Sequence, residues 1–129
     1  MIADFDWVAA RHACTMAAAF ARLLLEARRN VTIRNDLVPA RAEIRFEVMA
    51  SLTEFTVLRH VDRPGGIRRG VHFRHDETTL TVTEGANGTP ILTATLTLND
   101  LGECRFKVDD AELKAWQVLR RALEALFFE

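Results

Sequence analysis

The sequence lacks most of the features by which catalytic and membrane proteins are recognised. It has no tyrosine, only two cysteines and a net charge of −1 over 129 residues. No apolar run approaches the roughly 18 residues needed to cross a bilayer, so we predict no membrane partner. The near-neutral charge excludes a generally basic nucleic-acid-binding protein, and any such function must depend on a local patch.

The cysteines are too few and too far apart to form a recognisable framework. Cys14 and Cys104 are widely separated, and no CxxC pair occurs, whereas metal knuckles and disulfide scaffolds show characteristic spacings. We therefore expect two reduced thiols packed in the core, with no metal and no cofactor. Asp4 and Asp6 lie where a signal peptide would be positively charged, so we expect a cytoplasmic location.

Catalytic motifs are also absent. The chain contains no GxGxxG, P-loop, HExxH or GxSxG sequence. The stretch RPGGIRRG is rich in glycine, but it lacks the strand–loop–helix setting that points backbone amides at a phosphate. The sequence therefore names no reaction, and we favour a protein that is not an enzyme.

What is present is a composition typical of one folded domain over residues 1–129, since 49% of the residues are apolar. Residues 4–29 contain neither proline nor glycine and predict a long helix. One side of this helix carries Phe5, Val8, His12, Met16, Phe20 and Leu23, and the other carries Trp7, Ala10, Cys14, Ala18, Ala21 and Leu25. Because a helix that is apolar on two sides is usually buried on both, we expect a sheet on one side and a helix on the other.

A second helix is predicted at the end of the chain. The sequence DDAE reads as a capping box, with Asp109 as N-cap and Glu112 three residues later. Behind it, Trp116, Leu119, Ala122, Leu123 and Leu126 form a wide apolar arc, and Phe127 and Phe128 follow.

Between the helices the apolar period changes to two, which predicts strands. A weak strand is predicted at Val31–Ile33, followed by hairpins with a three-residue turn at Pro64–Gly65–Gly66 and a tight turn at Asp76–Glu77. Paired antiparallel residues share a face, which places Val71 and Phe73 opposite Val82 and Leu80, Leu80 and Val82 opposite Ala94 and Leu92, and Leu96 and Leu98 opposite Phe106 and Cys104. The expected fold is α+β, an antiparallel β-meander of about six strands with a long N-terminal helix and a C-terminal helix packed on one face.

The most unusual stretch is RHVDRPGGIRRGVHFRH, residues 59–75, with five arginines and three histidines. Its candidate anion-binding residues are Arg59, Arg63, Arg68, Arg69, His72 and Arg74. The expected register places Asp62 opposite Arg68 and Glu84 opposite Arg69, which reduces the free charge. A hairpin kept apart from other strands by its charge is the simpler interpretation. Nucleic acid is not favoured, because no aromatic side chain faces outward for base stacking.

Three functions remain open from the sequence. We favour a small non-enzymatic binding or assembly protein that forms a homo-oligomer, such as a homodimer, because its helices carry more apolar surface than one sheet face covers. The candidate interface residues are Trp7, Cys14, Ala18, Ala21, Leu25, Phe127 and Phe128. The alternatives are a phosphate-anion or nucleic-acid binder that uses the basic hairpin, and a small enzyme that uses His60, His72 or His75 beside an open cleft. The identity of a protein partner is not predicted.

Overall fold

A computed structural model describes residues 4–39, 42–61, 63–66, 68–85 and 87–129. Its elements run in the order α1 (Trp7–Ala13), α2 (Met16–Leu37), β1 (Ile44–Ala50), β2 (Glu54–Val61), β3 (Arg69–His75), β4 (Leu80–Glu84), β5 (Thr89–Leu98), β6 (Cys104–Val108), β7 (Ala111–Leu113) and α3 (Ala115–Phe128).

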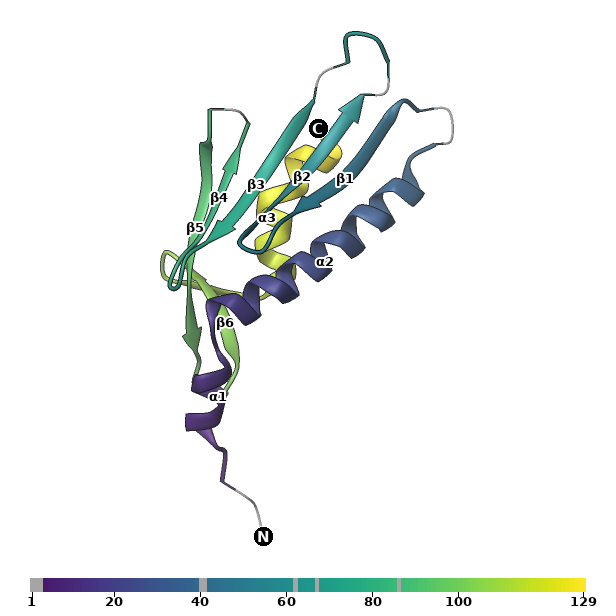
Figure 1. Cartoon of the computed structure of the whole chain (residues 1–129). Coiled ribbons are helices and arrows are strands. Elements are labelled where there is room, and N and C mark those ends of the chain that lie inside the picture. Colours follow the sequence, from purple (N-terminus) through teal and green to yellow (C-terminus); the bar gives the residue numbers. More distant parts are fainter. Residues whose placement is uncertain (1–3, 40–41, 62, 67, 86) are drawn as a thin grey trace.

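The strands form one seven-stranded antiparallel sheet in which spatial order follows sequence order from β1 to β7. Helices α2 and α3 pack on one face, which we call the inner face (Figure 1). The α+β meander predicted from the sequence is therefore confirmed. The strand that the prediction lacked is β7, which is only three residues long.

The core lies between the inner face of the sheet and the two helices. At its centre Phe55 of β2 stacks on Phe73 of β3 with ring centroids 4.4 Å apart. Phe20 of α2 packs on the Phe55 ring, with ring centroids 5.1 Å apart. Leu23 of α2 and Leu119 of α3 are also buried. The alternating apolar residues of the strands thus face inward, as their period of two requires.

Two hairpin registers agree with the sequence prediction and two differ by two residues. Leu80 pairs with Ala94 and Leu98 with Cys104, as expected. However, Val71 pairs with Glu84 instead of Val82, because the β3–β4 turn is longer than a tight turn at Asp76–Glu77. Similarly, Arg59 pairs with Arg69, so the β2–β3 connection is longer than the predicted three-residue turn at 64–66. The predicted pairing of Asp62 with Arg68 lies outside the described residues.

The predicted N-terminal helix is broken into two helices. Thr15 caps α2 by accepting a hydrogen bond from the amide of Ala18 at 3.2 Å, and α1 meets α2 at a bend of 64°. The bend turns Phe5, Val8 and His12 away from the core and leaves them exposed. The chain then stays helical through 31–33, where a strand was predicted, because Val31 lies on the buried side of α2.

The C-terminal helix begins later than predicted. Asp109 does not cap it, because this residue has a φ of 54° in the turn between β6 and β7, and Glu112 belongs to β7. The N-cap is Lys114, whose amide donates to the side-chain oxygen of Gln117 at 2.7 Å. The DDAE sequence thus resembles a capping box but forms a hairpin, since pairing with β6 outweighs the local helix signal.

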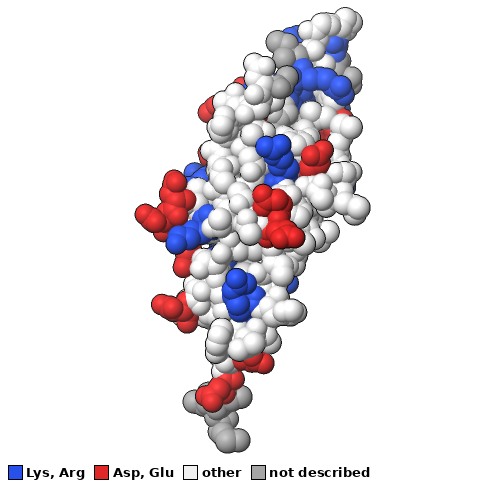
Figure 2. All heavy atoms as spheres, turned by 60° about the vertical axis from the view of Figure 1, so that its left-hand side comes forward, with Lys and Arg blue, Asp and Glu red and all other residues white. Residues whose placement is uncertain are grey.

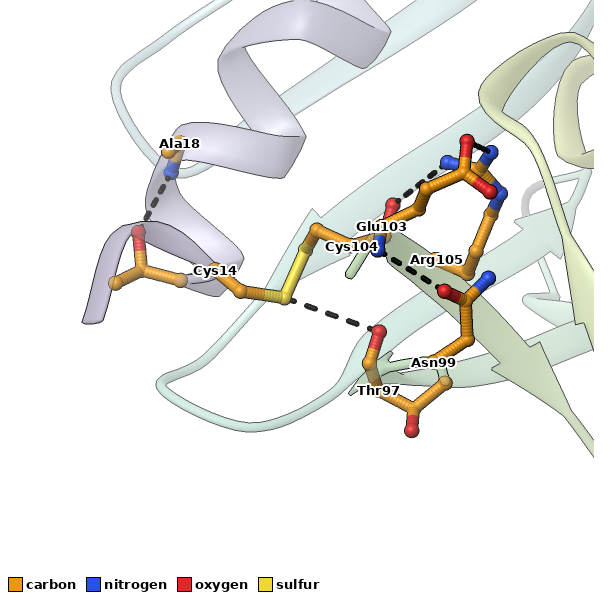
Figure 3. Close-up of a disulfide and its surroundings, with 8 residues drawn as sticks. Cys14, Ala18, Thr97, Asn99, Glu103, Cys104 and Arg105 are labelled. Atoms are coloured by element: carbon orange, nitrogen blue, oxygen red, sulfur yellow. Dashed lines mark hydrogen bonds and ion pairs between the residues drawn. A yellow bond between two sulfur atoms is a disulfide. The ribbon is translucent and has the colours of Figure 1, made fainter. Parts of the chain in front are cut away.

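The expectation of two reduced cysteines is wrong. Cys14, between α1 and α2, forms a disulfide with Cys104 at the start of β6, and their Cα atoms are 5.5 Å apart (Figure 3). Spacing in the sequence could not reveal this bond, since 90 positions separate the two residues. The fold brings them together by placing the break between α1 and α2 beside the start of β6.

One side chain of α2 covers part of the edge of the sheet. The amide group of Asn35 donates to the carbonyl oxygen of Phe46 at 2.8 Å and accepts from the Phe46 amide at 2.9 Å. Phe46 lies in β1, the first strand of the sheet. Asn35 therefore satisfies both backbone groups that Phe46 would otherwise present at this edge.

No single described helix is long and apolar enough to cross a bilayer, and only α1 and α2 taken together as a bent pair reach that length and composition.

The β3–β4 turn depends on Asp76, whose carboxylate accepts from the amides of Thr78 at 2.9 Å and Thr79 at 2.8 Å. These backbone hydrogen bonds lower the pKa of Asp76 from its ordinary value of 3.8. Because the folded-state pKa is lowered, the charged form stabilises the fold above pH about 4, and this contribution is lost as the pH falls through the lowered pKa.

We therefore expect Asp76→Ala to unfold at a lower temperature than the native protein at neutral pH, and we expect the difference to shrink in strong acid. Differential scanning calorimetry over a pH series measures this. Glu77→Ala, a change at the next exposed acid, serves as the control. A difference that stays constant with pH would contradict the role assigned to the Asp76 carboxylate.

Candidate functional site

The first candidate surface is the face of α2 that points away from the sheet, which we call the assembly face. It consists of Ala18, Ala21, Leu25, Ile33 and Leu37, all of which are exposed. Leu25 is 72% exposed and Leu37 is 66% exposed. Leu25, Ile33 and Leu37 follow one row of the helix, and the exposed Arg29 interrupts this row between Leu25 and Ile33. The assembly face is therefore an exposed, mainly apolar surface with one charge in its row.

The predicted interface residues do not form one surface. Ala18, Ala21 and Leu25 lie together on the assembly face. Trp7 is exposed on α1, and α1 and the C-terminal end of α3 lie at opposite ends of the molecule (Figure 1). Cys14 is buried in the disulfide, and Phe127 is buried against the Phe46 ring, with centroids 5.0 Å apart. Of the two C-terminal aromatics, Phe128 is the exposed one.

A groove of about 400 Å³ runs beside the assembly face, between α2 and α3. Ile33 and Leu37 form one wall, and Trp116 and Phe128 lie on the other side. Arg34 crosses the upper end of the groove, where its Nε donates to the carbonyl oxygen of Phe127 at 2.9 Å. This contact satisfies a carbonyl at the C-terminus of α3, where positive charge is favourable.

The second candidate surface is on the opposite, outer face of the sheet. A hollow of about 560 Å³ lies over Gly70 of β3, and we call it the outer-face hollow. Gly70 is one of its lining residues, and Leu58 lies close to it, since a Cβ atom at position 70 would lie only 2.9 Å from Cδ2 of Leu58. The described residues around it are Thr56, Leu58, Arg68, Arg69, Gly70, His72, Arg74, Thr83, Gly85 and Gly88, none of which is acidic.

His72 is held between two neighbours at the side of this hollow. Its Nδ1 lies 2.7 Å from the hydroxyl of Thr56, and its Nε2 lies 3.4 Å from a carboxylate oxygen of Glu54. Both partners come from β2, where Thr56 lies opposite His72 and Glu54 lies opposite Arg74. A hydroxyl, an imidazole and a carboxylate in this order fix the orientation of the ring and give the hollow one oriented polar wall.

The six predicted anion-binding residues divide into two groups. Arg68, His72 and Arg74 line the hollow from the outer face. Arg59 points to the inner side, where it donates to the carbonyl of Leu126 at 3.3 Å and so satisfies the end of α3. Arg69 also lines the hollow, but it pairs with Glu84 at 2.7 Å, as the sequence predicted. The remaining residue, Arg63, is exposed and lies 3.9 Å from Glu43.

Figure 2 shows one face of the molecule, with basic atoms gathered towards its upper end and separate acidic and basic residues below. On this face, the described residues therefore present patches of both signs.

The two other histidines of the basic stretch have separate partners. His60 lies 2.5 Å from Glu47 and accepts from Nε of Arg68 at 3.0 Å. His75 packs its ring on Phe20, with centroids 4.4 Å apart. Among the described residues, no group of three or more His, Cys, Asp or Glu comes together to hold a metal ion.

Sequence reasoning missed the groups that give the two surfaces their shape. The sequence shows Gly70 only as one of several glycines in a basic stretch, and its place beside the hollow depends on the fold. Ile33 and Leu37 were missed because the helix was predicted to end before them. Their spacing with Leu25 is helical, and this signal was present in the sequence.

Comparison with known proteins gives no relative from which a function could be transferred, since no family model, no curated protein and no solved structure matches this chain.

Proposed function

We propose that the protein is a non-enzymatic assembly protein that forms a homodimer through the assembly face of α2. The observation that carries this proposal is the exposure of Leu25, Ile33 and Leu37 on one helix. Burial of apolar area of this kind contributes roughly 25 cal/mol for each Å² removed from water. A second copy is the favoured occupant, because the face is complementary to itself.

The first complementarity is one of size. The N-terminal half of the assembly face is small, with Ala18 and Ala21, and its C-terminal half is large, with Ile33 and Leu37. An antiparallel pair of α2 helices centred between Ala27 and Arg28 sets each small half against the large half of the other copy. Ala18 of one copy then lies beside Leu37 of the other. The small alanine leaves room for the leucine, so the two helices can pack closely.

The second complementarity is one of charge. In the same antiparallel arrangement Glu26 of each copy lies beside Arg29 of the other, and both side chains are exposed in the single chain. A two-fold axis repeats this contact, so each dimer has two such pairs. Arg29 lies in the same row as Leu25 and Ile33, so these pairs lie within the proposed interface, where complementary charges contribute to orientation and partner choice.

Sedimentation equilibrium at micromolar concentration tests the proposal. We expect a mass twice the 14.6 kDa of the chain. Leu25→Glu should raise the dissociation constant at least about a hundredfold, since it places a charge in the apolar interface. Leu52→Glu is the matched control, because Leu52 is 96% exposed and lies outside the assembly face. A native protein that sediments as the 14.6 kDa monomer would remove the proposal.

Charge reversal tests the orientation of the two helices. Arg29→Glu alone sets like charges against each other, at Glu26 of the second copy, and should weaken the dimer. Adding Glu26→Arg to the same chain should restore it, because both contacts are then reversed together. If the double variant is as weak as the single one, the antiparallel arrangement is wrong.

The disulfide also indicates the kind of compartment in which the protein is located. Acidic residues near the N-terminus predicted a cytoplasmic location, but a cytoplasm rich in reductants keeps most thiols reduced. The Cys14–Cys104 bond favours an oxidising compartment, and we include this location in the proposal.

A further inference from the structure

We infer that the outer-face hollow binds an extended anion that carries several phosphate groups, of the oligophosphate type. The hollow lies on the sheet face opposite α2 and α3, so this inference is independent of the proposed dimer. It follows from the shape of the hollow, from the donors around it and from the spacing of two arginines.

The shape admits a chain that lies along β3. Gly70 carries no side chain where its neighbours on the outer face carry large ones, and a Cβ there would lie 2.9 Å from Leu58 and 3.3 Å from Thr56. Leu58 and Thr56 thus lean towards Gly70, and all three residues line the hollow of about 560 Å³. Glycine at such a position lets a ligand approach the backbone closely.

The donors around the hollow are those that bind phosphate. Arg68 and Arg74 are exposed, and a guanidinium group presents a planar fork that matches two phosphate oxygens. The bond from Arg68 to His60 uses Nε only. The hydroxyl groups of Thr56 and Thr83 add neutral donors on the two neighbouring strands.

The spacing of the arginines sets the length of the ligand. Arg68, just before β3, and Arg74, within it, are six residues apart, which corresponds to about 20 Å of extended backbone at ~3.3 Å per residue. A single phosphate ion therefore reaches one of them, and a chain of phosphates reaches both. Affinity should thus rise with chain length, as it does when linked groups bind two sites together.

The lack of aromatic rings separates an oligophosphate from a nucleic acid. The chain has no tyrosine, and no described outer-face position carries Phe or Trp. Single-stranded nucleic acids gain much of their affinity by stacking bases on such rings. Here the bases would add no contact, so the phosphate chain itself is the ligand that the hollow fits.

Glu54 provides a variant that should strengthen anion binding, whereas damage to the fold would weaken it. Its carboxylate contacts His72, and Glu54 lies directly opposite Arg74 in the ladder. It therefore repels an incoming anion at one end of the hollow. Glu54→Gln removes this charge and should tighten binding about threefold, the size expected for an exposed charge pair.

Isothermal titration calorimetry on the native disulfide-bonded protein tests the inference with three probes: orthophosphate, long-chain inorganic polyphosphate and oligothymidylate. We expect polyphosphate to bind most tightly and its affinity to fall as salt is raised. Arg68→Gln and Arg74→Gln should each weaken it about tenfold, as loss of a charged hydrogen bond does. Arg121→Gln, a change at an exposed arginine of α3, should leave it within about twofold.

Three results would overturn the inference. The first is polyphosphate binding that Arg68→Gln and Arg74→Gln leave unchanged, or that Arg121→Gln weakens equally. The second is orthophosphate that binds as tightly as the chain. The third is binding of oligothymidylate in the absence of polyphosphate binding, which would indicate a nucleic-acid surface. Failure of the dimer test affects none of these readouts, because the hollow lies within one chain.

Discussion

Reduction of the Cys14–Cys104 disulfide is expected to lower the free energy of unfolding by about 4 kcal/mol, because the bond closes a loop of 90 residues in the unfolded chain. A cross-link of this length removes much of the conformational freedom of the unfolded state. In the native state the disulfide is also the main attachment of the α1 region to the sheet, since no residue of α1 is buried. The loss is a large fraction of the 5–15 kcal/mol typical of a domain.

Urea denaturation of the oxidised and the reduced protein measures this effect. We expect a lower midpoint after reduction and a larger m-value, since an unfolded chain without the cross-link exposes more surface. Cys14→Ala with Cys104→Ala should behave like the reduced protein and should not respond to reductant. Equal midpoints for the oxidised and reduced forms would contradict the prediction.

Phe55→Ala is expected to destabilise the protein by about 4 kcal/mol, in the range found when a buried phenylalanine is truncated. Phe55 is 1% exposed and joins three elements, since its own strand β2 meets β3 through the Phe73 ring and α2 through the Phe20 ring. Removing its ring leaves a cavity where the helix meets the sheet, and neighbours on two rigid strands cannot close it.

The same substitution at an exposed phenylalanine gives the control. Phe128 is 68% exposed and contacts the guanidinium group of Arg34, 4.9 Å from the ring centroid. Phe128→Ala should therefore cost less than about 1 kcal/mol. Thermal or urea unfolding of the two variants beside the native protein compares them. If Phe55→Ala is no more harmful than Phe128→Ala, the core is not organised around this ring.

The sequence predicted the parts of the fold that depend on local pattern. Alternating residues such as Phe55, Val57, Val71 and Phe73 indicated which strand face is buried, and the structure confirms it. Registers were less certain, because a turn that is longer by two residues keeps the same residues inward. The β3–β4 hairpin differs in this way, since the Asp76 carboxylate stabilises a wider turn than the pattern suggested.

The parts that sequence could not predict depend on contacts between distant residues. The helix breaks at Cys14 and Thr15, where Cys14 is bonded to β6 and Thr15 caps α2. One threonine in an alanine-rich stretch does not by itself predict this break. The candidate sites show the same limit. The arginines of the basic stretch were evident, but the direction of Arg59 towards α3 and the hollow beside Gly70 depend on neighbouring strands and helices.

The hydrogen bonds of Asn35 to Phe46 bear on how copies of the protein avoid the wrong kind of association. An open outer strand is a template on which another chain can add, and repeated addition leads to fibrous aggregates. The Asn35 side chain occupies the backbone groups of Phe46 to which an added strand would bond. Arg45 and Glu47 place charge on either side of Phe46 in β1. At the other end of the sheet, β7 is too short to template a partner. Because both edge strands of the sheet are protected from strand addition, the proposed dimer would form through the helices rather than by edge-to-edge pairing.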